Sequence, residues 1–198
     1  MSKRRVVVTG LGIVSPLGND LASSWDGIVN GRSGIAEITS FDASAMATRI
    51  AGEVKGFDPL AWIAPKDVKK MDTFIHYGVA ASLMAIRDSG LEVNEGNAER
   101  IGAMIGSGIG GILGIEEQTV KYHEGGVRKI SPFYIPSTII NMLPGQISLM
   151  TGIQGPNFSA VSACASANHS IGVAMRTIQY GDADAMIVGG AERGTTPT

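Results

Sequence analysis

Cysteine is nearly absent from this sequence, since Cys164 is the only one among 198 residues. A single thiol excludes a disulfide within the chain and a metal cluster built on cysteines, and it fits a reducing compartment such as the cytoplasm. The histidines at 76, 123 and 169 are too scattered along the chain to predict a metal site. We therefore expect no metal and no cofactor.

A strong charge of either sign is also absent. Sixteen Lys and Arg against eighteen Asp and Glu give a formal net charge of -2, so composition offers no electrostatic reason to bind nucleic acid or an anionic membrane. The apolar run at residues 4–9 is followed by Gly10 and Gly12 and by no small-residue cleavage site, so it predicts a strand and not a signal peptide. No stretch is apolar enough to span a bilayer. We expect a cytoplasmic protein that binds neither nucleic acid nor membranes.

The sequence lacks a complete nucleotide-binding motif. No Gly-Lys-Ser/Thr occurs, so there is no P-loop. The stretch GSGIGG at 106–111 matches G-x-G-x-x-G, but a dinucleotide site needs a further strand about twenty residues later, where the sequence reads VKYHEGGVRK. A near-match at 10–15 is followed by a helical pattern. Dinucleotide binding is therefore a weak alternative, and these glycines predict tight turns and close packing.

Glycine, in contrast, is abundant, with 27 residues that separate short apolar runs from helix-like segments. The runs predict strands at 4–9, 49–54, 100–105, 157–163 and 184–189. Apolar spacing and capping residues predict helices at 20–30, 65–89, 112–123, 136–150 (bent or interrupted at Pro144) and 165–180. Strands that alternate with helices predict an α/β protein with a parallel sheet covered on both faces.

The one cysteine lies where an expected strand gives way to an expected helix. In VSACASANHS (161–170), small side chains flank Cys164. Free N–H groups at a helix N-terminus favour an anion such as a thiolate, and they could also bind a developing oxyanion. A nucleophile needs a base as well, and His169 would lie on a different helix face. Cys164 is thus either a candidate nucleophile without its partner or a small buried apolar residue.

Several long motifs, in the same order, give the whole chain a family resemblance. They are RVVVTGLGIVSPLG, KKMDTFIHYG, IGSGIGG, ISPFYIPSTIINM, GPNFSAVSACASANHSIG and YGDADAMIVGGAE. The chain resembles the N-terminal half of the β-ketoacyl-acyl carrier protein synthases, the condensing enzymes of fatty-acid synthesis. IGSGIGG and PSTIINM are more similar to type II, the synthase that favours longer acyl chains, whereas SACASANHSIG has features of type I.

The resemblance implies a thiolase-like fold, in which two similar α/β halves form an α-β-α-β-α layered sandwich, usually within a homodimer. Residues 1–198 would form one N-terminal domain, truncated before its end, with the C-terminal half absent. That second half carries two catalytic histidines, a lysine and a gating loop in the family. We therefore expect the isolated chain to be inactive.

The resemblance also implies a reaction and the residues that carry it. Cys164 would accept an acyl group from acyl carrier protein as a thioester. Malonyl-acyl carrier protein would then lose carbon dioxide, and the resulting carbanion would attack that thioester to give a β-ketoacyl chain two carbons longer. Ile109 matches the position that gates the acyl pocket. Tyr134 falls where an aromatic residue lines this pocket or the dimer contact.

Two groups of basic residues match the positions at which the family docks its acidic carrier protein. Lys66, Lys69 and Lys70 have the spacing of one helix face, and Arg128 and Lys129 form a second pair. Spacing alone fits an ordinary solvated helix face equally well. A non-catalytic module that binds acyl carrier protein or mediates dimerisation is therefore an alternative to the enzyme.

Overall fold

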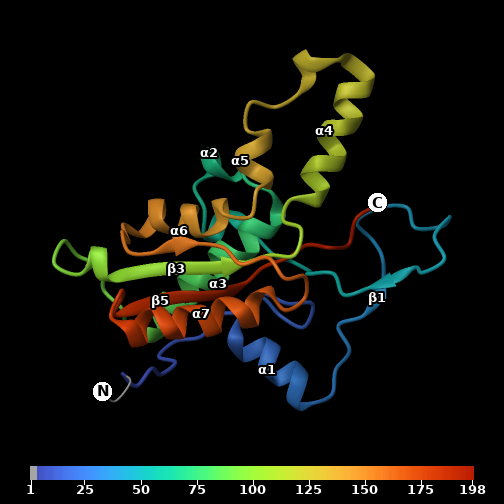
Figure 1. Ribbon diagram of the computed structural model, residues 1–198. Helices are drawn as coiled ribbons and strands as arrows, with labels where there is room; N and C mark the ends of the chain where they lie inside the picture. The colour runs from blue at the N-terminus through green and yellow to red at the C-terminus, as the bar shows by residue number, and fades with distance from the viewer. Residues whose placement is uncertain (1–3) are drawn as a thin grey trace.

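A three-stranded parallel sheet lies at the centre of the computed structural model, which describes residues 4–198 (Figure 1). The strand order is β4 (Asn157–Phe158), β3 (Ile101–Gly106), β5 (Ala185–Gly190). β3 is buried along its whole length and pairs with every residue of β5. Because the strands are parallel, their carboxyl ends meet at one edge of the sheet.

Helices cover both faces of this sheet, as the alternation predicted. α7 (Ser166–Tyr180) contacts one face, and α3 (Thr73–Ser89) and α6 (Met142–Thr151) contact the other (Figure 1). Successive side chains of a strand point to opposite faces. Alternate residues of β3 therefore join the main core beneath α3 and α6, whose buried members are Ile63, Met71, Phe74, Ile75, Val79, Ile101, Ala103, Ile105, Leu143, Ile147, Ile153 and Ile187.

The remaining elements surround this body. α1 (Leu21–Val29) precedes an antiparallel pair formed by β1 (Ala36–Glu37) and β2 (Ile50–Ala51). The others are η1 (Pro59–Ala61), α2 (Pro65–Val68), η2 (Ala98–Arg100), α4 (Ile112–Gly125), η3 (Val127–Lys129) and α5 (Tyr134–Thr138). α4 extends away from the sheet at the top of Figure 1.

Capping residues set two helix boundaries where the sequence placed them. The Asp20 carboxylate accepts a hydrogen bond from the Ser23 N–H at 2.7 Å, and this bond lowers the pKa of Asp20. α1 then ends before Gly31, which has a φ of +63°. α3 likewise begins after Asp72 and ends at a left-handed Gly90.

The expected strand at 4–9 is wrong. No strand of the described chain pairs with this segment, and Val7 and Val8 are 59% and 77% exposed. β-branched residues favour an extended backbone, but a strand needs a hydrogen-bonded neighbour. The following residues pack on α3 instead: a Cβ at Gly10 would lie 2.2 Å from the Ala85 carbonyl oxygen, so only glycine fits.

Other boundaries differ from the sequence interpretation. The strand expected at 157–163 is limited to Asn157–Phe158, and the one expected at 49–54 to Ile50–Ala51. The helix expected at 65–89 is broken between α2 and α3. The helix expected at 136–150 is interrupted at 139–141 and not at Pro144. Pro144 occupies the third position of α6, where its missing N–H removes no helical hydrogen bond.

Candidate active site

Cys164 lies in the sharp turn that leads into α7, and its thiol is exposed. Ala163, directly before it, has a φ of 51° and is the one non-glycine residue of 4–198 with a positive φ. Such a turn lifts the next side chain out of the backbone plane at the end of a sheet. The expectation of an exposed thiol at the start of a helix is confirmed, although the strand expected directly before it ends at Phe158, and the alternative of a small buried apolar residue is wrong.

A serine on the first turn of α7 braces this strained backbone. The Ser166 hydroxyl donates a hydrogen bond to the Ala163 carbonyl at 2.7 Å and accepts one from the Ser162 N–H at 2.9 Å. Ser166 is 3% exposed, so both bonds are shielded from water. The sequence analysis gave Ser166 no such role, although a serine just inside an expected helix start is a known signal for local backbone bonding.

His169 contacts the turn through a different residue. Its Nδ1 forms a 2.5 Å hydrogen bond with the Ser162 hydroxyl. His169 does not belong to the set of described residues that line the cavity beside Cys164. The structure therefore links His169 to the Ser162 side chain of the turn and does not place it in the cavity beside Cys164.

Cys164 opens on a cavity of about 430 Å³ at the carboxyl ends of β3 and β5. Its walls are mostly glycine, alanine and serine: Gly106, Ser107, Gly108, Ile109, Ala163, Cys164, Ser166, Ala167, Gly190, Ala191 and Glu192. This edge is where ligands bind in parallel α/β folds. The structure brings Ile109 and Cys164 to one cavity. It does not bring Tyr134 there: Tyr134 is half-buried at the start of α5.

Small residues allow α7 to sit directly on the strand ends. A Cβ at Gly106 would lie 2.7 Å from the Ala160 carbonyl oxygen, and one at Gly190 would lie 2.7 Å from the Cβ of Ala167. Ala167 and Ser166 are thus small because they pack against these glycines. This close approach places the thiol at the edge of the sheet.

Glu192 is a site residue that the sequence analysis missed. It follows β5, and its carboxylate accepts hydrogen bonds from the N–H groups of Gly108, Ile109 and Gly110. In a dinucleotide-binding loop such N–H groups would face a pyrophosphate. Here they face a carboxylate of the chain itself, so the dinucleotide alternative loses its phosphate site.

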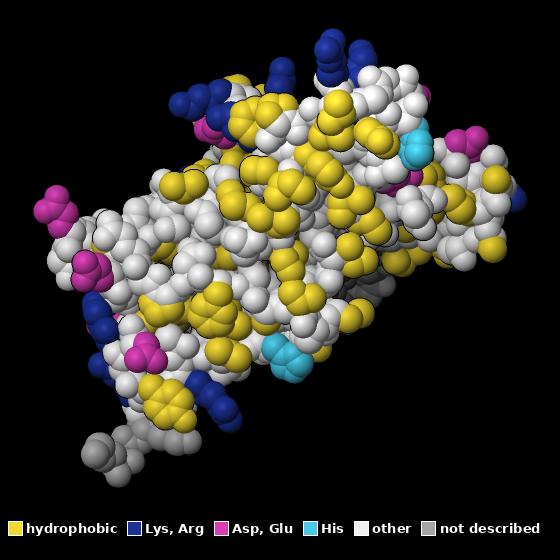
Figure 2. Space-filling view, turned by 45° about the horizontal axis from the view of Figure 1, so that its top comes forward, with side chains coloured by type: hydrophobic (Ala, Val, Ile, Leu, Met, Phe, Trp, Pro, Cys, Tyr) yellow, Lys and Arg dark blue, Asp and Glu magenta, His cyan; other side chains and the backbone are white. Residues whose placement is uncertain are grey.

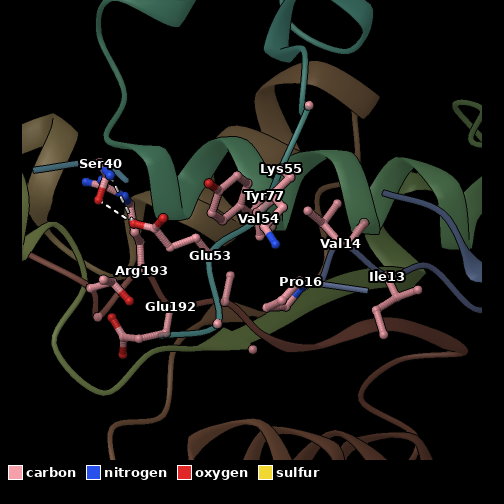
Figure 3. Close-up of a pocket in the computed structure, with 18 of the residues that line it drawn as sticks. Ile13, Val14, Pro16, Ser40, Glu53, Val54, Lys55, Tyr77, Glu192 and Arg193 are labelled. Carbon is pink, nitrogen blue, oxygen red and sulfur yellow. Dashed lines mark hydrogen bonds between the residues drawn. The ribbon is translucent and has the colours of Figure 1, made fainter. Parts of the chain in front are cut away.

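A second cavity, of about 580 Å³, lies on the other side of the segment that follows β5. In Figure 3, Glu192 and Arg193 flank one side of it and Ile13 the other, with Tyr77 of α3 between them. Hydrogen bonds, foremost from the Ser40 hydroxyl, hold the pKa of Glu53 at about 2, and burial raises the pKa of Tyr77. This cavity is the larger of the two, but the chain's cysteine lines the other one, so we take the cavity at Cys164 as the candidate site.

The expected basic face on one helix is wrong. α2 ends at Val68, so Lys66 is helical whereas Lys69 and Lys70 follow in a turn. Lys70 is also paired, because its Nζ lies 2.7 Å from the Asp67 carboxylate, and this bond lowers the pKa of Asp67. Lys66 and Lys69 remain exposed.

A contact between an aromatic ring and an ammonium group connects the turn after α2 to the segment that follows η3. The Lys70 Nζ lies 5.7 Å from the centre of the Phe133 ring, in the segment between η3 and α5. Arg128 and Lys129 lie in η3, and both are exposed. Figure 2 shows Lys and Arg side chains along the upper edge of the molecule, beside apolar surface. Exposed basic side chains thus lie in α2 and the turn after it, and in the short 3-10 helix η3.

Within residues 4–198, no helix has both the length and the apolar character needed to cross a membrane. Within the same residues, no three His, Cys, Asp or Glu side chains are grouped so that they could hold a metal ion.

Comparison with known proteins supplies the family. The model of the family "Beta-ketoacyl synthase, N-terminal domain" matches residues 3–198. The chain is 55% identical to the 3-oxoacyl-[acyl-carrier-protein] synthase 2 of Vibrio cholerae and 50% identical to that of Coxiella burnetii, over 197 residues. Each alignment covers 100% of this chain and 48% of the relative, so the chain spans about half the length of these relatives.

Solved structures give the same result for the fold. The ishigamide ketosynthase/chain length factor superposes with a TM-score of 0.87 at 28% identity, covering 96% of this chain and 48% of that one. A type II polyketide ketosynthase in complex with its acyl-carrier protein superposes with a TM-score of 0.84 at 26% identity, covering 99% and 53%. The thiolase-like α/β fold expected from the motifs is confirmed by these ketosynthases. The chain belongs to the β-ketoacyl synthase family, of which it represents the N-terminal domain.

Proposed function

We propose that these residues form the nucleophile-bearing half of a β-ketoacyl-acyl carrier protein synthase of type II, an acyltransferase of fatty-acid elongation. The observation that carries the proposal is the exposed Cys164 thiol, raised by a strained turn at the mouth of a cavity at the sheet's carboxyl edge. Curated relatives at 50–55% identity bear the name 3-oxoacyl-[acyl-carrier-protein] synthase 2. Residues 1–198 are one domain in this proposal.

The first half-reaction uses groups that this chain contains. The Sγ of Cys164 attacks the thioester carbonyl carbon of an acyl-carrier protein, and the carbonyl electrons move onto oxygen. Backbone N–H groups of the turn that leads into α7 are suited to stabilise that oxyanion, although those of Ala165 and Ser166 already donate to the Ser162 and Ala163 carbonyls at 3.1 Å. The intermediate then collapses, the carrier's thiolate leaves and takes up a proton, and the acyl group remains on Sγ as a new thioester.

The second half-reaction returns the thiol. Malonyl-carrier protein loses carbon dioxide, and the carbanion so formed attacks the acyl-Cys164 carbonyl. The C–S bond breaks, Cys164 leaves as a thiolate, and the β-ketoacyl chain stays on the carrier. Ile109 lines the cavity in which the acyl chain begins. Tyr134 has its proposed place farther along the acyl channel or at a dimer contact, since it lies outside the Cys164 cavity.

The proposal also includes how acyl carrier protein docks, how the protein assembles and where in the cell it acts. Lys66, Lys69, Arg128 and Lys129 are exposed, and an acidic carrier protein would be attracted to them. Lys70, which is paired with Asp67, contributes less free charge. One related ketosynthase was solved in complex with its acyl-carrier protein. A homodimer, malonyl-carrier protein as second substrate and action in the cytoplasm are part of the same proposal, which the family resemblance supports.

The intact mass of the protein after incubation with an acyl-carrier thioester tests this function. We expect an added acyl mass on the full-length protein that carries these residues and no added mass on its Cys164→Ala variant. The increment should be released by hydroxylamine, as a thioester is. An increment of equal size on the alanine variant, or none on a folded full-length protein, would reject Cys164 as the acceptor.

A binding module without catalysis is the second candidate, favoured because Glu192, the other titratable side chain lining the cavity at Cys164, is already engaged by four hydrogen-bond donors. It predicts that the protein binds acyl carrier protein while its mass stays unchanged. The same incubation, read alongside a binding titration with the carrier, separates the two candidates.

A further inference from the structure

Glu192 forms hydrogen bonds with the loop at 107–110, which lines the same cavity as the candidate nucleophile Cys164. Its Oε2 accepts hydrogen bonds from the N–H groups of Gly108 at 2.6 Å and Ile109 at 3.0 Å, and from the Ser107 hydroxyl at 3.1 Å. Its Oε1 accepts a bond from the Gly110 N–H at 3.2 Å. One carboxylate thus receives four donors from four successive residues, across more than eighty positions of sequence.

Consecutive N–H groups that converge on one point form an anion-binding nest. Bonds from N–H or O–H groups to a carboxylate are about twice as strong as those between neutral groups. The fit is close, because a Cβ at Gly108 would lie 2.9 Å from the Oε2 of Glu192. The glycine at 108 therefore makes room for a side chain of the same chain.

The four hydrogen bonds from residues 107–110 to Glu192, which we call the clasp, determine where Ile109 lies. Its N–H is held by Glu192, whereas its side chain is 58% exposed and has little packing of its own to fix it. The far end of the loop has separate anchors, since Gly111 donates to the Thr138 carbonyl at 2.9 Å and Gly110 also donates to the Ser107 hydroxyl. Glu192 is thus the contact that fixes the part of the loop facing Cys164.

We propose that Glu192 is a positioning residue that holds Ile109 across the mouth of the Cys164 cavity and so limits which groups reach the thiol. It acts through Ile109 and takes no part in bond making. Its meaning for acyl chains rests on the proposed function. Its effect on access to Cys164 does not, because access can be measured with any thiol reagent.

Two readouts on the full-length protein that carries these residues test this positioning role. The first is amide hydrogen exchange at 108–110, and the second is the ratio of the rates at which N-octylmaleimide and N-methylmaleimide alkylate Cys164. In Glu192→Gln, one carboxylate oxygen becomes an NH₂ group that faces N–H donors. We expect exchange to become about tenfold faster, as loss of a charge-assisted hydrogen bond implies, and the octyl-to-methyl ratio to move to the value of Ile109→Ala.

Matched variants separate positioning from folding. Glu117→Gln, an exposed acid of the neighbouring α4, removes the same charge and should change neither readout. Gly108→Ala disturbs the clasp but keeps the Glu192 charge, so it should shift both readouts in the same direction as Glu192→Gln. If Glu192→Gln fails to fold by circular dichroism, Gly108→Ala carries the test. A folded clasp variant with wild-type exchange and a wild-type ratio overturns the proposal.

An activity measurement on the full-length protein tests whether the clasp affects which acyl chain lengths are accepted. There we expect Glu192→Gln to change the ratio of kcat/KM values for long and short acyl-carrier substrates and to leave the methyl reagent's rate unchanged. Absence of acylation together with a shifted maleimide ratio would reject the proposed function and keep the clasp. Normal acylation of Cys164 with an unshifted ratio would reject the clasp and keep the function.

Discussion

Ala163 adopts a backbone conformation that alanine rarely takes. A left-handed φ costs a non-glycine residue roughly 1–2 kcal/mol, because its Cβ approaches the following carbonyl oxygen. The two hydrogen bonds of Ser166 brace the residues on either side of the turn and offset part of this cost. Strain held next to an exposed thiol is consistent with a turn selected for where it aims Cys164.

Substitution at 163 tests this strain. In Ala163→Val a β-branched side chain would have to adopt a φ of 51°, so we expect a loss of about 1–3 kcal/mol in the free energy of unfolding. Ala163→Gly should stay within about 1 kcal/mol of the parent, since relief of strain and added chain entropy oppose each other. Urea unfolding measures both. Equal stability of the valine and glycine variants would show that the turn carries no strain.

At the scale of elements, a carboxylate ties the β1–β2 hairpin together. Glu53 accepts bonds from the hydroxyls of Ser40 and Thr39 and from both of their N–H groups, and these bonds, with the Ser40 hydroxyl foremost, lower its pKa from 4.5 to about 2. A depressed folded-state pKa adds stability above the unfolded value, and that stability is lost as the pH falls from about 4.5 toward about 2.

The acid dependence of stability tests this tie. In Glu53→Gln we expect a lower free energy of unfolding at pH 7 and a shallower fall of that free energy between pH 4.5 and pH 2. Glu37→Gln, on the exposed edge of the same hairpin, serves as the control and should keep the parent's slope. Urea unfolding across this pH range gives the comparison, and an unchanged slope in Glu53→Gln would exclude Glu53 as a source of acid sensitivity.

Sequence patterns predicted elements best where the determinants are local. Asp20 and Gly90 set helix ends through their own backbone geometry, and both helix ends were predicted. The strand at 4–9 failed because pairing depends on a neighbour that the pattern does not specify. Glu192 was missed for the same reason: its four donors lie more than eighty residues away, and only the fold brings them together.

At the scale of the whole molecule, α7 also has apolar side chains on faces that are exposed in this structure. Ser166, Ser170 and Ala174 are buried, while Ile171 and Met175, which lie on other faces of the helix, are 47% and 42% exposed. A helix with apolar residues on both sides is suited to packing between two layers. This fits the α-β-α-β-α sandwich that the family resemblance implies, in which α7 would pack against the second half of the protein.

The cavity at Cys164 contains few groups that could catalyse the decarboxylation step. Cys164 and Glu192 are the titratable residues among those lining the cavity, and Glu192 is engaged by the loop. Decarboxylation of a malonyl thioester needs donors at the thioester oxygen to stabilise the developing negative charge. We therefore expect the 198-residue chain to be inactive when it is given acyl- and malonyl-carrier proteins. It should release no more carbon dioxide and form no more β-ketoacyl product than its Cys164→Ala variant, as measured by mass spectrometry of the carrier.

The full-length protein should form product in the same assay. Product from the short chain that depends on Cys164 would mean that residues 1–198 contain the whole catalytic apparatus, and the second half would then serve selection or assembly instead of chemistry.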